Sequence, residues 1–295
     1  MTAHLIDGKK IAAEIRAELK DEVFKLKHRG VIPGLGVILV GDDPASKSYV
    51  TAKEKACEEI GIFSDDNRLS ARTSQTELMA VIARMNRDPK INGILVQLPL
   101  PRHLDESDVL LAIDPSKDVD GFHPTNVGRM VVGEKAFLPC TPHGCIQLLL
   151  RSQVKIEGAH VVVVGRSNIV GKPLANLLMQ KGPYGNATVT VCHTRTPDIG
   201  AFTRQADIVI AAAGKPNTVT ADMIREGAVV IDVGVNRIED ATKKAGFRLV
   251  GDVDFESVRH KASLITPVPG GVGPMTITML LYNTVESAKR ANALA

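Results

Sequence analysis

The sequence predicts an α/β protein built from two parallel-sheet domains, and three observations support this fold class. Short apolar runs, such as 35–40 and 159–164, alternate with longer segments of helical periodicity. A Gly/Pro turn separates each run from the helix behind it, which is the pattern of β-α units and of a parallel sheet. The length of 295 residues is enough for about two domains of the usual ~150 residues each.

Composition describes an ordinary globular chain and argues against several functions. Apolar residues make up 44% and charged residues 23% of the sequence, as in typical globular domains. The net charge of +3 is small and dispersed, so we expect neither nucleic acid nor a membrane as a partner. The N-terminal segment has no signal-peptide core and carries too many acids for a transit peptide, and no apolar run approaches the length of a membrane span.

The cysteines favour a reducing, cytoplasmic location. The four of them show neither a CxxC pair nor the spacing of a disulfide framework. No histidine is suitably spaced near two of them, so we expect no zinc site and no other metal centre. They are Cys57, Cys140, Cys145 and Cys192.

The first half of the chain contains repeated β-α units before residue 115. Near-continuous apolar strands are typical of buried parallel sheets, and Ser74-Gln-Thr-Glu77 is a capping box that opens a helix. Ser46 is expected to be the N-cap of the second helix. The expected elements are helices over 11–27, 52–60 and 74–86 and strands over 35–40, 62–69 and 91–97.

Polar side chains follow the carboxyl ends of two of these strands, where ligands bind in such sheets. Tyr49 and Lys53 are four residues apart, so on a helix they share a face and combine a flat ring with a proton carrier. Gln97 ends its strand as either a hydrogen-bonding group or a cap on the next turn. On this stretch alone, the preferred interpretation is a solvated lysine face with a half-buried tyrosine.

The segment 114–124 is rich in turn formers and acids. One interpretation is a solvated linker with Asx turns. The alternative is that Asp120, which precedes Gly121, faces a ligand that carries N–H donors. A helix with Thr141 as N-cap and Pro142 at its first position is expected to follow and to join the two domains.

The second domain opens like a Rossmann fold. A strand over 159–164 leads into Gly165-Arg166-Ser167, and Gly171 precedes a helix over 174–181. Backbone N–H groups and the helix dipole at such a turn hold a pyrophosphate. The turn departs from G-x-G-x-x-G, because Ser167 replaces the second glycine and the last glycine is displaced to Gly171.

The end of the next strand, 187–192, favours NADP over NAD. An acid would bind the ribose hydroxyl of NAD, but here His193, Thr194 and Arg195 follow. Arg195, with Arg166 from the first turn, could bind a 2′-phosphate; the alternative is that Arg195 is a surface cation. A later strand ends in Asp232-x-Gly-x-Asn, which we expect to place backbone near the nicotinamide.

The segment 269–277 contains three glycines and two prolines within its first six residues. It is either an ordinary turn before a last helix over 276–294 or a bare backbone loop that ligands approach closely.

These motifs together resemble the methylenetetrahydrofolate dehydrogenase/methenyltetrahydrofolate cyclohydrolase family. Gln75-x-Glu77 through Asn86-x-Asp88, continued by 94–100, resembles its first motif, and 269–277 resembles its second. The segment 117–124 also matches, and Tyr49-x-x-x-Lys53 falls at the catalytic helix of the family. The resemblance spans residues 5–290. It outweighs the interpretations above in which these residues have no functional role.

The resemblance implies NADP as the cofactor, tetrahydrofolate derivatives as substrates, a homodimer and an active-site cleft between the domains. It implies a folate-binding catalytic domain over 1–139 plus 276–295 and an NADP-binding domain over 140–275. Lys53 would be the catalytic residue, Tyr49 would stack on the folate, and Gln97 would hydrogen-bond Lys53 and influence its protonation. Asp120 would bind the pterin N–H groups.

Further site residues follow from the same resemblance. Where the family has Ser near Thr194, this chain has Thr and Arg195, so the 2′-phosphate contact differs there. The other substrate-binding positions would be Val96, Leu98, Pro269, Gly270, Gly271, Val272 and Gly273, and the cofactor-binding positions would be Gly165, Arg166, Ser167, Thr194, Arg195 and Val235. The alternatives are a shikimate-type NADP dehydrogenase and a non-catalytic NADP-binding protein.

Overall fold

The computed structural model describes residues 2–243 and 246–294, and these divide into two compact units. The three-stranded unit contains Ala13–Cys140 and the residues from Ile277 onward; the six-stranded unit contains Thr141–Thr276 and the N-terminal residues up to Ala12. The expected boundaries placed those first residues in the other domain. They differ because β1 (His4–Leu5) pairs in parallel with β11 (Leu264–Ile265).

The sheet of the three-stranded unit has the parallel order β3-β2-β4. Its strands are β2 (Gly34–Val40), β3 (Phe63–Leu69) and β4 (Gly93–Val96). Every residue of β2 is buried, as expected for a central strand that is covered on both faces. All three strands were predicted to within two residues at each end; β2 and β4 come from apolar runs, whereas β3 is mostly polar.

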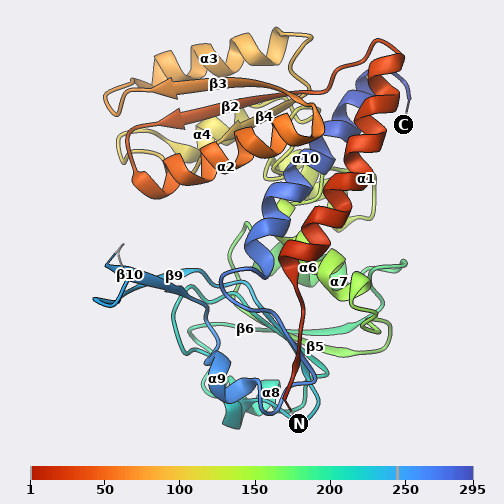
Figure 1. The fold of residues 1–295 in the computed structure, drawn as a ribbon, viewed down its shortest axis with the longest axis vertical. Helices are drawn as coiled ribbons and strands as arrows, with labels where there is room; N and C mark the ends of the chain where they lie inside the picture. Colours follow the sequence, from red (N-terminus) through yellow and green to blue (C-terminus); the bar gives the residue numbers. More distant parts are fainter. Residues whose placement is uncertain (1, 244–245, 295) are drawn as a thin grey trace. The chain divides into compact units, whose positions relative to one another are not determined.

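Helices α2 (Pro44–Ile60) and α3 (Gln75–Arg87) lie on opposite sides of this sheet (Figure 1). The predicted capping box of α3 is present, with both reciprocal Ser74–Glu77 hydrogen bonds formed. Leu78, Ile82 and Met85 turn the apolar face of α3 into the core. The other helices that lie wholly or mostly in this unit are α1 (Gly8–His28), α4 (Glu106–Leu111), α5 (Pro124–Val131) and α10 (Val272–Ala291).

Helix α10 holds the segment around Val119 and Leu138 by hydrogen bonds. It begins at Val272, four residues before the predicted start, because the second half of the glycine-rich segment is already helical. The buried Asn283 side chain donates to the carbonyl oxygens of Val119 (2.8 Å) and Leu138 (2.9 Å). Lys289 forms an ion pair with Glu22 of α1 at 3.0 Å, which places the two helices side by side (Figure 1).

The six-stranded unit has an all-parallel sheet of order β1-β11-β8-β7-β5-β6. Strand β5 lies between β6, which follows it in sequence, and β7, which comes later. The strand order therefore reverses at β5, since the chain continues to β6 on one side of it and to β7 on the other. Doubly wound sheets bind their ligands at the carboxyl ends of the strands, at the point where the order reverses. The other strands are β5 (His160–Val164), β6 (Thr188–Cys192), β7 (Ile208–Ala211) and β8 (Val229–Asp232).

Some features of this unit were not predicted. Strands β9 (Asn236–Glu239) and β10 (Phe247–Val250) form an antiparallel pair. Helix α6 (Cys140–Arg151) begins before Thr141, which is therefore not its N-cap; the Thr141 hydroxyl pairs with that of Thr276 instead. The other helical elements of the unit are α7 (Gly171–Met179), which was predicted over 174–181, and the short α8 (Gly200–Thr203), η1 (Ala221–Met223) and α9 (Phe255–Val258). Within 2–243 and 246–294, no helix is long and apolar enough to cross a membrane.

We expect Asn283→Ala to lower the free energy of unfolding by about 2–3 kcal/mol, because the Leu138 carbonyl loses its side-chain donor and the Val119 carbonyl keeps only the weak Cys140 thiol donor. Asn292→Ala, which removes an amide just beyond the end of the same helix, should change it by less than about 0.5 kcal/mol. Urea unfolding followed by circular dichroism measures both variants. Equal effects of the two substitutions would contradict this role of Asn283.

Candidate functional site

Helix α2 carries the central residues of the candidate site, and its start is fixed by Asp43. The Asp43 carboxylate accepts the Ser46 N–H at 2.8 Å, and Pro44 occupies the first turn. The prediction of Ser46 as N-cap was wrong, because Asp43 caps the helix three residues earlier. Gly61 ends the helix in the left-handed conformation with φ 83°, which favours glycine.

Lys53 is a buried cation on the inner face of α2, with only 8% of its surface exposed. Its Nζ donates to Gln97 Oε1 at 3.1 Å, so the expected hydrogen bond between the two is present. Gln97 also donates from Nε2 to the Leu98 carbonyl oxygen at 2.7 Å. The two interpretations of Gln97 therefore both apply: it binds Lys53 and it fixes the turn after β4.

Burial shifts the pKa values of this cluster in opposite directions. It lowers the pKa of Lys53, although the nearby Asp120 raises it in part. It raises the pKa of Asp120 to about 6, an effect that Lys53 opposes and Asp118 reinforces. Burial also raises the pKa of the Cys140 thiol well above its usual range, and this thiol donates to the Val119 carbonyl oxygen at 3.3 Å.

The loop that carries Asp120 is folded against the unit and is not a solvated linker. Asp118 is 1% exposed and accepts the N–H groups of Phe122 (3.2 Å) and His123 (2.9 Å). Gly121 has φ +73°, and a Cβ there would meet the Leu138 backbone carbon at 2.7 Å. Asp118 thus holds the loop in place, and Asp120 remains for other contacts.

The other expected substrate-binding positions differ in exposure. Tyr49 lies one helical turn before Lys53 and is 43% exposed. The Val96 side chain is 3% exposed and belongs to the core, so only its backbone could face a ligand. Leu98 is half-buried. Across 2–243 and 246–294, no group of three or more His, Cys, Asp or Glu side chains could hold a metal ion.

The segment 269–273 belongs to the six-stranded unit. Pro269 is exposed, Gly270 has φ +110°, and its carbonyl oxygen accepts the Lys9 N–H at 3.2 Å. A Cβ at Gly271 would meet the Thr266 Cβ at 2.8 Å. These glycines let the loop pack on the chain beside it. A Cβ at Gly273 would meet nothing within 4 Å, so that position is open.

The turn after β5 fits a dinucleotide. Gly165 has φ +136°, and a Cβ there would collide with the Ala212 carbonyl oxygen, as one at Gly171 would with that of Gly165. The Ser167 hydroxyl accepts the N–H groups of Val170 (3.1 Å) and Gly171 (3.3 Å). Ser167 therefore shapes a bare-backbone cradle at the start of α7, which begins at Gly171 and not at 174 as predicted.

Two arginines flank this turn. Arg166 follows Gly165, and Arg195 follows the end of β6; both are exposed, as is Thr194. Neither arginine forms an ion pair with any acid that the structure describes. The turn 193–196 is closed by hydrogen bonds from the Thr196 N–H to the His193 carbonyl oxygen and from the His193 N–H to the Thr196 hydroxyl, so Arg195 has a defined backbone.

The sequence did not reveal that two buried carboxylates organise the strand ends near Val235. Asp232 accepts the N–H groups of Gly234, Asp252 and Val253 at 2.9–3.0 Å. Asp252 accepts those of Ala213 (2.6 Å) and Gly214 (2.8 Å) and the Asn236 amide (2.8 Å). Burial raises the pKa of Asp232 to about 6. The only signal was the pair of strand-end segments Asp-Val-Gly and Asp-Val-Asp.

Comparison with known families identifies both halves of the chain. Residues 6–120 match the catalytic domain of tetrahydrofolate dehydrogenase/cyclohydrolase, and residues 139–292 match its NAD(P)-binding domain. The chain belongs to this family. It is an enzyme of folate one-carbon metabolism with dehydrogenase and cyclohydrolase activities. The family match decides against a shikimate-type dehydrogenase and against a non-catalytic binding protein.

Relatives cover the whole chain. The bifunctional protein FolD of Dehalococcoides mccartyi (strain CBDB1) is 60% identical over 100% of this chain and 99% of its own. The crystal structure of bifunctional FolD from Campylobacter jejuni is 52% identical, with a TM-score of 0.92 over 98% and 99% of the two chains. FolD of Trypanosoma brucei, solved with NADP cofactor and inhibitor, is 43% identical, with a TM-score of 0.94 over 99% of both.

We expect Asp120→Asn to stabilise the protein at pH 7.5. The folded pKa of Asp120, about 6, lies above the usual 3.8, so the folded state holds the proton more tightly and stability falls as pH rises from about 4 to about 6. Asparagine resembles the neutral acid and avoids this loss. The thermal unfolding midpoint of the variant should exceed that of wild type at pH 7.5, and the gap should shrink towards pH 4.5.

A variant less stable than wild type at pH 7.5, or a difference that does not change with pH, would contradict this account of Asp120. Asp114→Asn is the control, because that acid lies in the same segment but its pKa is lowered, mainly by Ser116. The control should lose stability at pH 7.5.

Proposed function

We propose that the enzyme oxidises 5,10-methylenetetrahydrofolate with NADP+ to the 5,10-methenyl form and then hydrolyses this cation to 10-formyltetrahydrofolate. The hydrogen bond of 3.1 Å between the buried Lys53 and Gln97 is the observation that carries the proposal. It places a lysine of lowered pKa beside an amide whose orientation is fixed from its other end. Bound NADP+ supplies the hydride acceptor for the oxidation.

Lys53 is proposed to move the protons of the hydrolysis. The neutral amine takes a proton from water as its oxygen bonds to the carbon between N5 and N10, and the ammonium returns it to N5 as the bond from that carbon to N5 breaks. Loss of the remaining hydroxyl proton forms the formyl group, so one proton is released overall. A base works best when its pKa is near the working pH, and burial brings that of Lys53 closer to it.

Asp120 and Tyr49 are proposed to hold the pterin. A carboxylate can accept a ring N–H and an exocyclic amine together, which requires the ionised form of Asp120. Its pKa of about 6 allows this at neutral pH. Tyr49 offers an exposed ring for stacking one turn from Lys53. We propose that the backbone at Val96 and Leu98 and the segment 269–273 complete the folate contacts.

The proposed NADP contacts lie in the six-stranded unit. The Gly165–Ser167 cradle would hold the pyrophosphate on backbone N–H groups at the start of α7. Arg166, Thr194 and Arg195 would bind the 2′-phosphate, since no acid lies at the end of β6 to favour NAD. Val235, half-exposed beyond the Asp232 network, would lie along the nicotinamide.

We also propose that the enzyme is a homodimer, as its family resemblance implies, and that it is cytoplasmic. All four cysteines are free and buried, which supports a reducing compartment.

One assay tests the function. NADPH formation from methylenetetrahydrofolate, followed by loss of the methenyl absorbance, is the expected result; oxidation without subsequent hydrolysis would remove the second half of the proposal.

We expect Lys53→Met to abolish methenyl hydrolysis while NADP binding, measured by fluorescence, stays within about threefold of wild type, because the cofactor contacts lie in the other unit. Loss of one general acid–base group typically costs ~10²–10⁴ in rate. Lys55→Met, an exposed lysine on the same helix, is the matched control and should retain activity. Hydrolysis at the wild-type rate in Lys53→Met would rule out the assignment.

We expect Arg166→Ala with Arg195→Ala to raise the Michaelis constant for NADP far more than that for NAD. Charge-assisted bonds to a phosphate are worth about 1.5–3 kcal/mol each, and only NADP has the 2′-phosphate. The control exchanges two exposed lysines of the same unit, Lys155 and Lys181, for alanine. An equal rise of the Michaelis constant for both cofactors would show that the two arginines do not bind the 2′-phosphate.

A further inference from the structure

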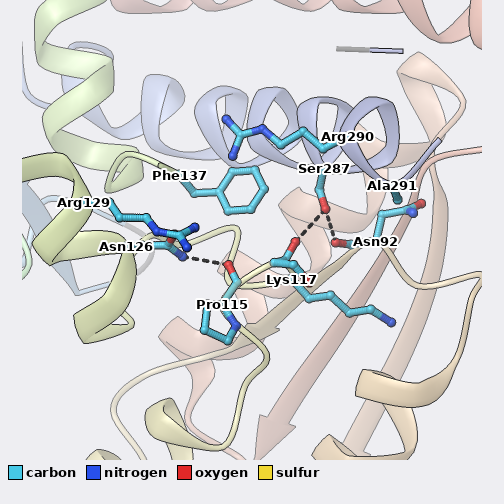
Figure 2. Close-up of a pocket in the computed structure, with 10 residues that line it drawn as sticks. Asn92, Pro115, Lys117, Asn126, Arg129, Phe137, Ser287, Arg290 and Ala291 are labelled. Carbon is cyan, nitrogen blue, oxygen red and sulfur yellow. Dashed lines mark hydrogen bonds between the residues drawn. The ribbon is translucent and has the colours of Figure 1, made fainter. Parts of the chain in front are cut away.

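A cavity of about 280 Å³ lies within the three-stranded unit (Figure 2). None of the ten residues that line it belongs to the proposed folate or NADP contacts. Its volume far exceeds the ~30 Å³ share of one liquid water and falls just below the ~300–1,000 Å³ of typical cofactor or drug pockets. The cavity therefore suits a small molecule or ion.

The lining has one sign of charge. Three of its residues are basic, namely Lys117, Arg129 and Arg290, and none is acidic. Among the described residues, neither Arg129 nor Arg290 forms an ion pair with an acid. Two guanidinium groups thus face one cavity without a carboxylate to neutralise them.

Arg290 is held in place by an aromatic ring. Its guanidinium carbon lies 4.4 Å from the centroid of Phe137, and the ring is 2% exposed. Stacking fixes the plane of the guanidinium. Its Nη2 donates to the Ala136 carbonyl oxygen at 3.5 Å, and a guanidinium has five N–H donors in all, so others can bind an anion. Figure 2 shows Arg129 reaching towards the same ring from α5, while Arg290 comes from α10.

Fixed polar contacts build the rest of the lining. Asn126 Nδ2 donates to the Pro115 carbonyl oxygen at 2.9 Å, and the Ser287 hydroxyl lies 2.6 Å from the Asn92 carbonyl oxygen. The Lys117 ammonium is occupied, because it donates to the carbonyl oxygens of Met85 (2.9 Å) and Asp88 (2.8 Å). The two arginines are therefore the cations of the cavity that can bind a ligand.

We propose that this cavity binds a small dianion between Arg129 and Arg290. Guanidinium groups bind phosphate and carboxylate oxygens through paired N–H bonds, and two of them match two negative charges. Free phosphate and small dicarboxylates share this chemistry. The site is separate from the folate and NADP contacts and does not depend on them.

Calorimetric titration of the full chain tests the proposal. Inorganic phosphate and glutarate are added in separate arms at constant ionic strength, with NADP+ at saturation so that the cofactor contacts are filled. We expect saturable binding of at least one dianion to wild type and binding at least tenfold weaker to Arg129→Gln/Arg290→Gln. The arm with the tighter binding identifies the anion as phosphate or dicarboxylate.

Arg29→Gln/Arg87→Gln is the matched control, because it removes the same charge from exposed positions outside the cavity; it should bind like wild type. If the double variant fails to fold, Arg129→Gln alone keeps the Arg290–Phe137 stack and should still weaken binding several-fold. No saturable binding to wild type, equal loss in the control, or unchanged binding in the arginine variants would overturn the proposal.

Discussion

The burial of the Lys53 ammonium is the constraint on which the catalytic unit depends. A buried cation without partners costs several kcal/mol, so polar groups must meet it. Gln97 at the end of β4 accepts a hydrogen bond from the ammonium, and the charge of the nearby Asp120 raises the pKa of Lys53 in part. Helix α2, the end of β4 and the loop around Asp120 must therefore keep one arrangement, which the Asp43 cap, the Asp118 hydrogen bonds and Asn283 maintain.

In the six-stranded unit the distribution of charge is reversed, with buried acids and exposed cations. There the buried groups are the carboxylates of Asp232 and Asp252, whose hydrogen bonds are mostly to backbone N–H groups and which thereby fix the loops at the strand ends. The cations, Arg166 and Arg195, are exposed. A buried lysine suits proton transfer, because its pKa can shift, whereas exposed arginines suit a phosphate, because they stay charged.

The sequence predicted what depends on local patterns. The apolar runs of β2 and β5 predicted the parallel sheets, the Ser74–Glu77 capping box is present, and the segment 52–60 predicted the second half of α2. The predictions failed where contacts between residues distant in sequence determine the structure. The two residues of β1 carry no periodicity, the cap of α2 went to Asp43 in competition with Ser46, and the Asp232–Asp252 network joins segments 20 residues apart.

The protonation of Lys53 in the folded enzyme tests the central claim most directly. Lysine labelled with ¹³C at Cε, with the Lys53 signal assigned by its absence from the Lys53→Met spectrum, gives the titration of this one ammonium. The account predicts a midpoint below the usual lysine value of ~10.4, with the exposed Lys55 as an internal comparison. A midpoint at or above the usual value would contradict it, because Lys53 would then stay charged and could not take a proton from water.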